Sequence, residues 1–144
     1  MSEILQSLKS VLESDLTEGK IKITLSENEL VNSSDCDVIR LTPVKCSNVK
    51  SYPGYRACIY EIQASVESLV RKREDAVTRV SEIVRNVINN IDKHTFSIEA
   101  SGYIALKDVK CKVANFPDKD IPVKNKLKSK IIINVETFEE QEVS

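Results

Sequence analysis

The sequence predicts a single α+β domain in which two amphipathic helices cover one face of a mixed β-sheet. Two stretches repeat apolar residues at helical spacing, and several short stretches alternate apolar and polar residues as half-buried strands do. The chain has 144 residues, which is enough to bury one core without metal or disulfide support. The predicted element order is α-β-β-β-α-β-β-β, within a domain spanning 1–138 and followed by an acidic, frayed tail over 139–144.

The two helices are predicted over 4–16 and 69–91, where the apolar side chains fall on one face of each. Ser2 is a suitable N-cap for the first helix, and Gly19 is a suitable stop after it. The second helix is rich in Val and Ile, which lowers its intrinsic helix propensity. We therefore expect this helix to depend on packing against a sheet.

The strands are predicted from short alternations, and the best of them runs over 55–66. The first strand that precedes it covers 21–25, and the second covers 37–42 and stops at Pro43. Stretches 26–35, 45–54 and 116–128 are expected to be loops, the second closed by Pro53 and Gly54. The remaining strands are expected at 96–100, 109–113 and 131–136. The residues between the apolar positions are mostly polar, so the second sheet face is expected to be polar.

Composition excludes several classes of protein. Charged residues make up 30% of the chain and the net charge is −1, which does not suit a protein that coats nucleic acid. We expect neither a signal peptide nor a membrane span, and therefore a protein made and kept in the cytoplasm. The four cysteines, Cys36, Cys46, Cys58 and Cys111, lack metal-ligand spacing and are expected to be reduced, mostly buried thiols.

No motif of a known enzyme class occurs in the sequence, so we expect no catalytic residue, cofactor or metal. Phosphate-binding, zinc-protease and nucleophile-elbow patterns are all missing. His94 is the single histidine, and nothing in the sequence marks a nucleophile or a second catalytic group beside it. The acidic pairs Glu74–Asp75 and Glu139–Glu140 are expected on solvated surfaces. An enzyme with a dispersed site stays an alternative, because sequence cannot show a pocket.

Two basic stretches are the candidate interface. The first opens the long helix, and the second lies in the loop before the last strand; their residues are Arg71, Lys72, Arg73, Lys119, Lys124, Lys126 and Lys128. Each stretch is read either as a solvated surface or as a contact with a protein or a phosphate backbone. No aromatic residue interleaves the lysines of the second stretch, which counts against base stacking there.

The stretch from Tyr55 to Glu136 resembles the tail-terminator proteins of long-tailed bacteriophages, also called minor tail or tail-completion proteins. The resemblance lies in size and element order: an early helix and strands, then CIYEIQA over 58–64, a long helix over 76–91, and a last strand KIIINVE over 130–136. It covers most of the chain but contains no residue motif, so no individual residue is carried over.

The resemblance implies a non-enzymatic virion assembly protein. Such a protein forms a hexameric ring that caps the tail tube and then joins it to the head or neck connector, after assembly in the host cytoplasm. The only nucleic acid that the resemblance implies is DNA that passes through the lumen of the ring. Two alternatives stay open: another head–tail neck component, and a small nucleic-acid-binding module that uses the basic patches at 71–73 and 119–130. A general partner-binding domain is the least specific alternative.

Overall fold

The computed structural model contains two helices and five strands among the residues it describes, which are 2–15, 21–25, 37–68, 73–91, 96, 98, 104–115 and 128–140. In chain order the elements are α1 (Ser2–Asp15), β1 (Ile21–Thr24), β2 (Asp37–Tyr52), β3 (Tyr55–Glu67), α2 (Arg73–Asn90), β4 (Ile104–Asn115) and β5 (Lys128–Glu140). The predicted α+β class is therefore confirmed.

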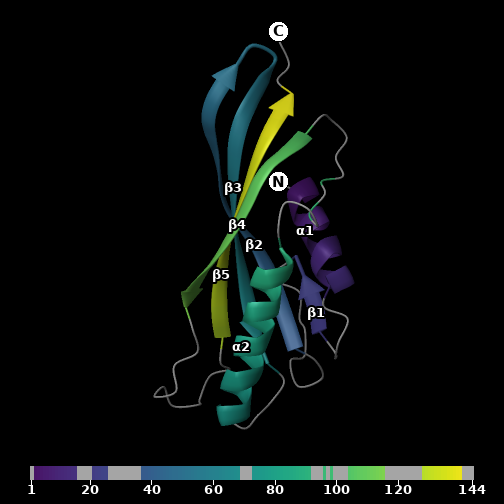
Figure 1. Cartoon of the computed structure of the whole chain (residues 1–144), viewed down its shortest axis with the longest axis vertical. Coiled ribbons are helices and arrows are strands. Elements are labelled where there is room, and N and C mark those ends of the chain that lie inside the picture. The colour runs from purple at the N-terminus through teal and green to yellow at the C-terminus, as the bar shows by residue number, and fades with distance from the viewer. Residues whose placement is uncertain are drawn as a thin grey trace.

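The five strands form one mixed sheet in the order β1-β2-β3-β5-β4 (Figure 1). β1 pairs with β2 in parallel, and all other neighbours pair antiparallel. β3 and β5 are the two central strands along most of the length of the sheet, and they pair over thirteen residues without a register shift. Their alternation sends one set of side chains towards the helices and the other set to the opposite face, which we call the outer face.

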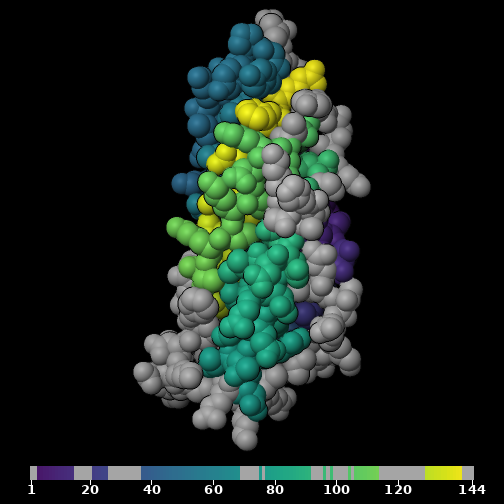
Figure 2. Space-filling model, in the orientation of Figure 1, coloured from purple at the N-terminus to yellow at the C-terminus, as the bar shows by residue number. Residues whose placement is uncertain are grey.

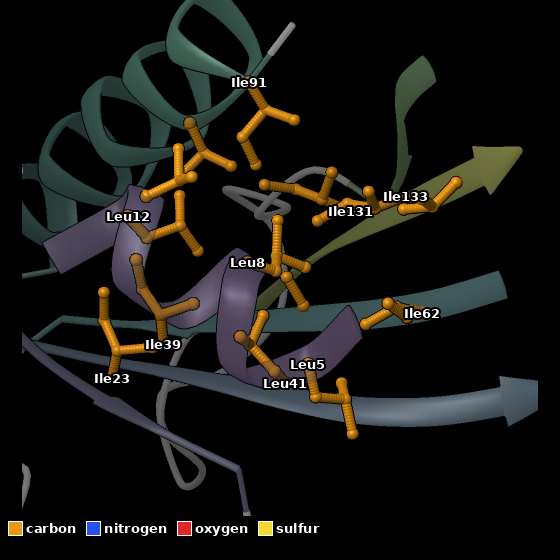
Figure 3. Close-up of a cluster of buried hydrophobic side chains, with 14 of the residues drawn as sticks. Leu5, Leu8, Leu12, Ile23, Ile39, Leu41, Ile62, Ile91, Ile131 and Ile133 are labelled. Carbon is orange, nitrogen blue, oxygen red and sulfur yellow. The ribbon is translucent and has the colours of Figure 1, made fainter. Parts of the chain in front are cut away.

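Both helices and the inner face of the sheet share one hydrophobic core (Figure 3). Leu8 and Leu12 of α1 are fully buried because they lie one turn apart on the stripe that faces the sheet. α2 contributes the same kind of stripe through Val80, Ile83, Val84 and Val87. The strands contribute the core positions Ile39, Leu41, Ile62, Ala64, Val66, Ile131, Ile133 and Val135.

Two ion pairs with poorly accessible carboxylates hold the end of the sheet nearest α2. Arg79 of α2 donates from Nε to Asp37 Oδ2 at 2.9 Å, and the Asp37 side chain is 3% exposed. Arg40 Nε lies 3.6 Å from Glu67 Oε1 across β2 and β3. Each carboxylate is costly to bury alone, so each pair restricts how the packed elements can slide past each other.

The structure corrects three expectations about the elements. β2 does not stop at Pro43 but continues to Tyr52, so the predicted loop over 45–54 is wrong. Only Pro53 and Gly54 form the connection, and Gly54 has a φ of 83°, the left-handed conformation that glycine adopts without strain. The alternation failed as a signal here because most of this part of β2 is exposed on both of its sides.

The remaining corrections concern the second half of the chain. A strand was predicted over 96–100. Phe96 and Ile98 are the two described residues of this stretch, and neither is in a strand, so the prediction is wrong at these positions. Phe96 is buried, and Ile98 packs against the core, which explains their apolar character. At the C-terminus β5 runs to Glu140, so Glu139 and Glu140 belong to the sheet rather than to a frayed tail; 141–144 lie outside the described residues.

Neighbouring isoleucines on β5 offer a matched test of the two sheet faces. Ile133 is 0% exposed, whereas Ile132 points to the outer face and is half-buried. We expect Ile133→Ala to lower the free energy of unfolding by about 2–5 kcal/mol, because it leaves a cavity in the core. Ile132→Ala should cost about 1 kcal/mol. Urea denaturation measures both, and equal losses would contradict this assignment of faces.

Candidate interaction surface

The structure describes little of the basic residues predicted as an interface. Arg71, Lys72, Lys119, Lys124 and Lys126 lie outside the described residues. Arg73 begins α2 and Lys128 begins β5, and only their backbone positions are described. The proximity of these residues to one another and their role stay a prediction.

A different feature stands out at the other end of the sheet, where β2 and β3 form a long projection that we call the hairpin arm, residues 43–60. In Figure 1 the tip of this arm extends past both helices. Residues 43–51 are all exposed, in contrast to the buried start of the same strand. Figure 2 shows the side chains of the arm at one end of the molecule, away from α2. The β2 part of the arm therefore offers surface on both of its sides, whereas Cys58 and Tyr60 in its β3 part are buried.

The arm carries every large hydrophobic side chain that is exposed among the described residues. Val49 is 60% exposed, Val44 is 49% exposed and Tyr55 is 39% exposed. Val44 and Val49 are the unpaired residues at the two register shifts between β2 and β3, where a β-bulge turns the extra side chain out of the ladder. All three lie on one projecting element, which makes the arm a candidate interaction surface.

Aromatic rings fix the tip of the arm to β5. Tyr52 and Tyr55 flank the turn and stack with their ring centroids 4.6 Å apart, and Tyr55 meets Phe138 edge to face at 5.9 Å. Lys50 Nζ lies 5.0 Å from the centroid of the Tyr52 ring, and Lys107 Nζ lies 5.7 Å from that of Phe138. Aromatic pairs and cation–π contacts of this kind each add roughly 0.5–1.5 kcal/mol. They hold the arm in one conformation.

On the inner face of the same region Glu139 is buried within a polar cluster. Tyr60 donates its hydroxyl to Glu139 Oε2 at 2.6 Å, and Thr137 donates to the same oxygen at 2.9 Å. The Cys58 thiol is also hydrogen-bonded to this carboxylate. The register explains the meeting, because Arg56 pairs with Glu139 and Cys58 with Thr137 across β3 and β5. Glu139 is only 8% exposed, so the expectation that it is solvated was wrong.

The cluster holds Glu139 ionised and its neighbours protonated. Burial raises the pKa of Glu139, but the hydrogen bonds from Tyr60, Cys58 and Thr137 and the charge of Arg56 outweigh it, so the pKa falls below its usual value. Burial and the Glu139 carboxylate raise the pKa of Cys58 to about 12, and the same two causes raise the pKa of Tyr60. No member of the cluster is therefore placed to exchange a proton near neutral pH.

The described cysteines differ in their exposure to solvent. Cys46 is exposed on the arm, Cys58 is buried, and Cys111 is half-buried in β4. Burial raises the pKa of Cys111 to about 11, so both Cys58 and Cys111 are thiols rather than reactive thiolates at neutral pH. All three are free, whereas Cys36 lies outside the described residues. Exposed Cys46 departs from the expectation that the thiols are mostly buried.

Two exposed edges of the sheet, the part of β2 beyond its pairing with β1 and strand β4, carry features that discourage pairing with another strand. β2 has two bulges and the lysines Lys45 and Lys50 along its exposed part, and β4 has two register shifts together with Lys110 and Lys112. Lysines and bulges are the devices by which sheet proteins prevent edge-to-edge association. A partner is therefore expected to meet the side chains of the arm rather than its backbone.

Sequence reasoning missed the arm, although one signal for it was present. A Pro-Gly pair between Tyr52 and Tyr55 is typical of a two-residue turn that places two aromatic side chains side by side. Glu139 gave no such signal, because its burial depends on pairing with a strand about eighty residues earlier.

Possible metal ligands, membrane-spanning helices and similarity to known proteins add few constraints on the function. No group of three or more possible metal ligands comes together within the described part of the chain. No helix there is long and apolar enough to span a bilayer. No protein-family model matches the sequence, and no curated protein matches it significantly. The resemblance to tail terminators therefore stays a prediction from the pattern of elements.

The ionised state of Glu139 predicts a pH dependence of stability. Because folding lowers its pKa, Glu139 stabilises the fold above its unfolded pKa of about 4.3, and this contribution disappears as pH falls through the folded value. We expect Glu139→Gln to cost about 1–3 kcal/mol at pH 7 and progressively less below pH about 4. Denaturant titrations from pH 7 to 3 measure this difference.

The neighbouring Glu140→Gln is the matched control, since Glu140 is exposed on the same strand. It should change stability by less than about 0.5 kcal/mol at either pH. If Glu139→Gln loses the same amount at pH 3 as at pH 7, the ionised, hydrogen-bonded carboxylate is disproved.

Thiol labelling provides a separate check on the arm. In a Cys36→Ser background we expect a thiol reagent at pH 8 to modify Cys46 fully before Cys58 and Cys111 react, because the latter two have raised pKa values. Mass spectrometry of the digested protein measures each site. Unfolding in urea should make all three react alike, and equal rates in the native protein would refute the burial of Cys58.

Proposed function

We propose that this chain is a non-enzymatic assembly subunit that joins copies of itself into a ring through the hairpin arm. The observation that carries the proposal is the exposure of Val44, Val49 and Tyr55 on a part of the sheet that extends past the core. Exposed apolar side chains gathered on one element mark a binding surface. The tip of the arm extends past both helices, and a partner that binds there would explain its length.

The rigidity of the arm supports the same proposal. The stack of Tyr52 on Tyr55, the edge contact with Phe138 and the Tyr60–Glu139 hydrogen bond connect the arm to β5 on both faces of the sheet. An interface element that is already ordered loses less conformational entropy on binding. In this proposal the polar cluster has a structural role. The pKa values of Cys58 and Glu139 are shifted away from neutral pH, which agrees with that role.

The specific form of the proposal is a protein of the tail-terminator type. The ring, a hexamer in this reading, caps the tail tube and then binds the head or neck connector, and the protein is part of the virion after assembly in the host cytoplasm. The succession of an early helix, three strands, a long helix and further strands supports this form. A different neck component would use the same surface, and DNA would only pass through the lumen.

The mass of the purified protein tests the proposal. We expect light scattering over about 1 μM to 1 mM to show a closed species of about six subunits, with rings in negative-stain images of the same samples. A ring stops at a fixed mass, whereas a non-closing contact gives a mass that continues to grow with concentration. A monomer throughout this range would contradict self-assembly.

A pair of variants tests the arm itself. Val44→Ser combined with Val49→Ser removes apolar surface that the contact would bury, and we expect the association constant to fall about tenfold or more. Both positions are exposed, so the melting temperature should change little. Val44→Ile combined with Val49→Ile keeps the apolar surface and should preserve assembly. Equal association by both variants would exclude the arm as the interface.

A further inference from the structure

The outer face of the sheet carries a group of basic side chains over its middle, which we call the basic patch. Ile132 points to this face, and Lys112 is opposite Ile132 in the ladder between β4 and β5. Residues that are directly opposite in a ladder share a face, and so do residues two apart on one strand. The register thus places five basic residues from β2, β4 and β5 on the outer face: Arg40, Lys45, Lys110, Lys112 and Lys130.

Carboxylates beside the patch offset part of its charge, and each of them is matched to one basic residue. Glu67 lies 3.6 Å from Arg40, Asp108 lies 3.6 Å from Lys110, Glu136 lies 3.4 Å from Lys107, and Glu61 is opposite Lys45. Two lysines of the patch, Lys112 and Lys130, have no described carboxylate opposite them. The positive charge that remains is therefore concentrated where β4 and β5 pair.

Lys112 and Lys130 are exposed, and neither forms a salt bridge with a described carboxylate. Lys112 is opposite Ile132, and Lys130 is opposite Ser65 of β3, so both meet uncharged neighbours across the ladder. Strand geometry puts the Cα atoms of the two lysines roughly 8 Å apart. Like charges placed this close cost free energy, so the fold gains nothing from the arrangement. An anionic ligand would explain it.

We propose that the basic patch binds the phosphate backbone of a double-stranded nucleic acid. A DNA duplex carries one negative charge about every 1.7 Å along its axis, so its backbone can meet several cations of one sheet face at once. Gln63 and Asn134 lie between the lysines and are only half-buried. Their amide groups can donate hydrogen bonds to phosphate oxygens.

The composition of the patch suits a phosphate backbone better than a protein partner. The large hydrophobic side chains that are exposed among the described residues all lie on the hairpin arm, so the patch offers a protein little apolar area to bury. No described aromatic side chain shares the outer face with the patch between Arg40 and Lys45, so bases find no stacking surface there. The contact is therefore electrostatic and independent of base sequence.

This contact goes beyond the proposed assembly, because a single copy is sufficient for it. It also differs from the nucleic-acid-binding module suggested by the sequence, which uses the stretches 71–73 and 119–130, since only Lys130 is common to both. If the proposed ring forms around DNA, the patch of every subunit lines the lumen.

Fluorescence anisotropy with a labelled DNA duplex of about 20 base pairs tests the proposal. We expect wild type to bind with a Kd of roughly 1–100 μM at about 50 mM NaCl. Its affinity should fall roughly 40-fold at about 200 mM NaCl, which is the salt dependence of about three phosphate contacts. Lys112→Gln combined with Lys130→Gln should weaken binding at least about tenfold at the lower salt concentration, and should reduce the loss at the higher one to roughly fourfold.

Lys9→Gln combined with Arg85→Gln is the matched control. It removes the same amount of positive charge from α1 and α2, which cover the opposite face of the sheet, and should change the affinity by less than about twofold. Circular dichroism confirms that each variant is folded. Wild type that fails to bind the duplex at low salt, or equal binding by the two double variants, would overturn the inference.

A labelled poly-glutamate peptide of about 20 residues separates nucleic acid from an acidic protein partner. We expect it to bind more weakly than the duplex, because its charges are less dense. If it binds more tightly than the duplex and through Lys112 and Lys130, the patch is a site for an acidic protein and the inference is wrong.

The same samples keep this inference separate from the proposed assembly. Lys112 and Lys130 lie outside the hairpin arm, so their double variant should self-associate as wild type does. Duplex binding by a protein that stays monomeric would overturn the assembly and leave the role of the patch intact. Rings that do not bind the duplex would have the reverse meaning.

Discussion

The antiparallel register between β3 and β5 is the constraint on which the rest of this structure depends. It is continuous over thirteen residue pairs, from Tyr55 opposite Glu140 to Glu67 opposite Lys128. At the helix-covered end it sets Ile62 against Ile133 and so builds the centre of the core. A shift by one residue would send these side chains to the outer face, at the cost of the buried apolar surface on two central strands.

The same register determines the other end of the sheet, where the tip of the hairpin arm extends past both helices (Figure 1). It sets the residues around Glu139 beside those of β3, so that a carboxylate, a phenol, a hydroxyl and a thiol meet on one face. On the other face it lets Phe138 meet the tyrosine pair at the turn. Because a buried carboxylate must have its hydrogen-bond partners, the cluster specifies the register from the projecting end as well.

These two ends divide the molecule into a stable core and a projecting arm with different physical demands. The core is held by apolar burial, which has no direction. The arm is held by aromatic stacking, hydrogen bonds and strand pairing, all of which require a specific geometry. An element held in this way is rigid, yet its exposed side chains stay accessible. Its bulges and lysines disfavour the addition of another strand, so we expect a partner to contact its side chains.

The sequence alone determined the fold class, the two amphipathic helices and the core-facing positions of β3 and β5, because burial on one side leaves a periodic pattern. It did not indicate that β2 continues from Pro43 to Tyr52, since a strand exposed on both sides has no apolar alternation. It misplaced Glu139 because an acidic side chain near a chain end resembles a solvated tail until its partners on β3 are known. Only the tertiary structure decided these points, because they depend on pairing between residues far apart in the chain.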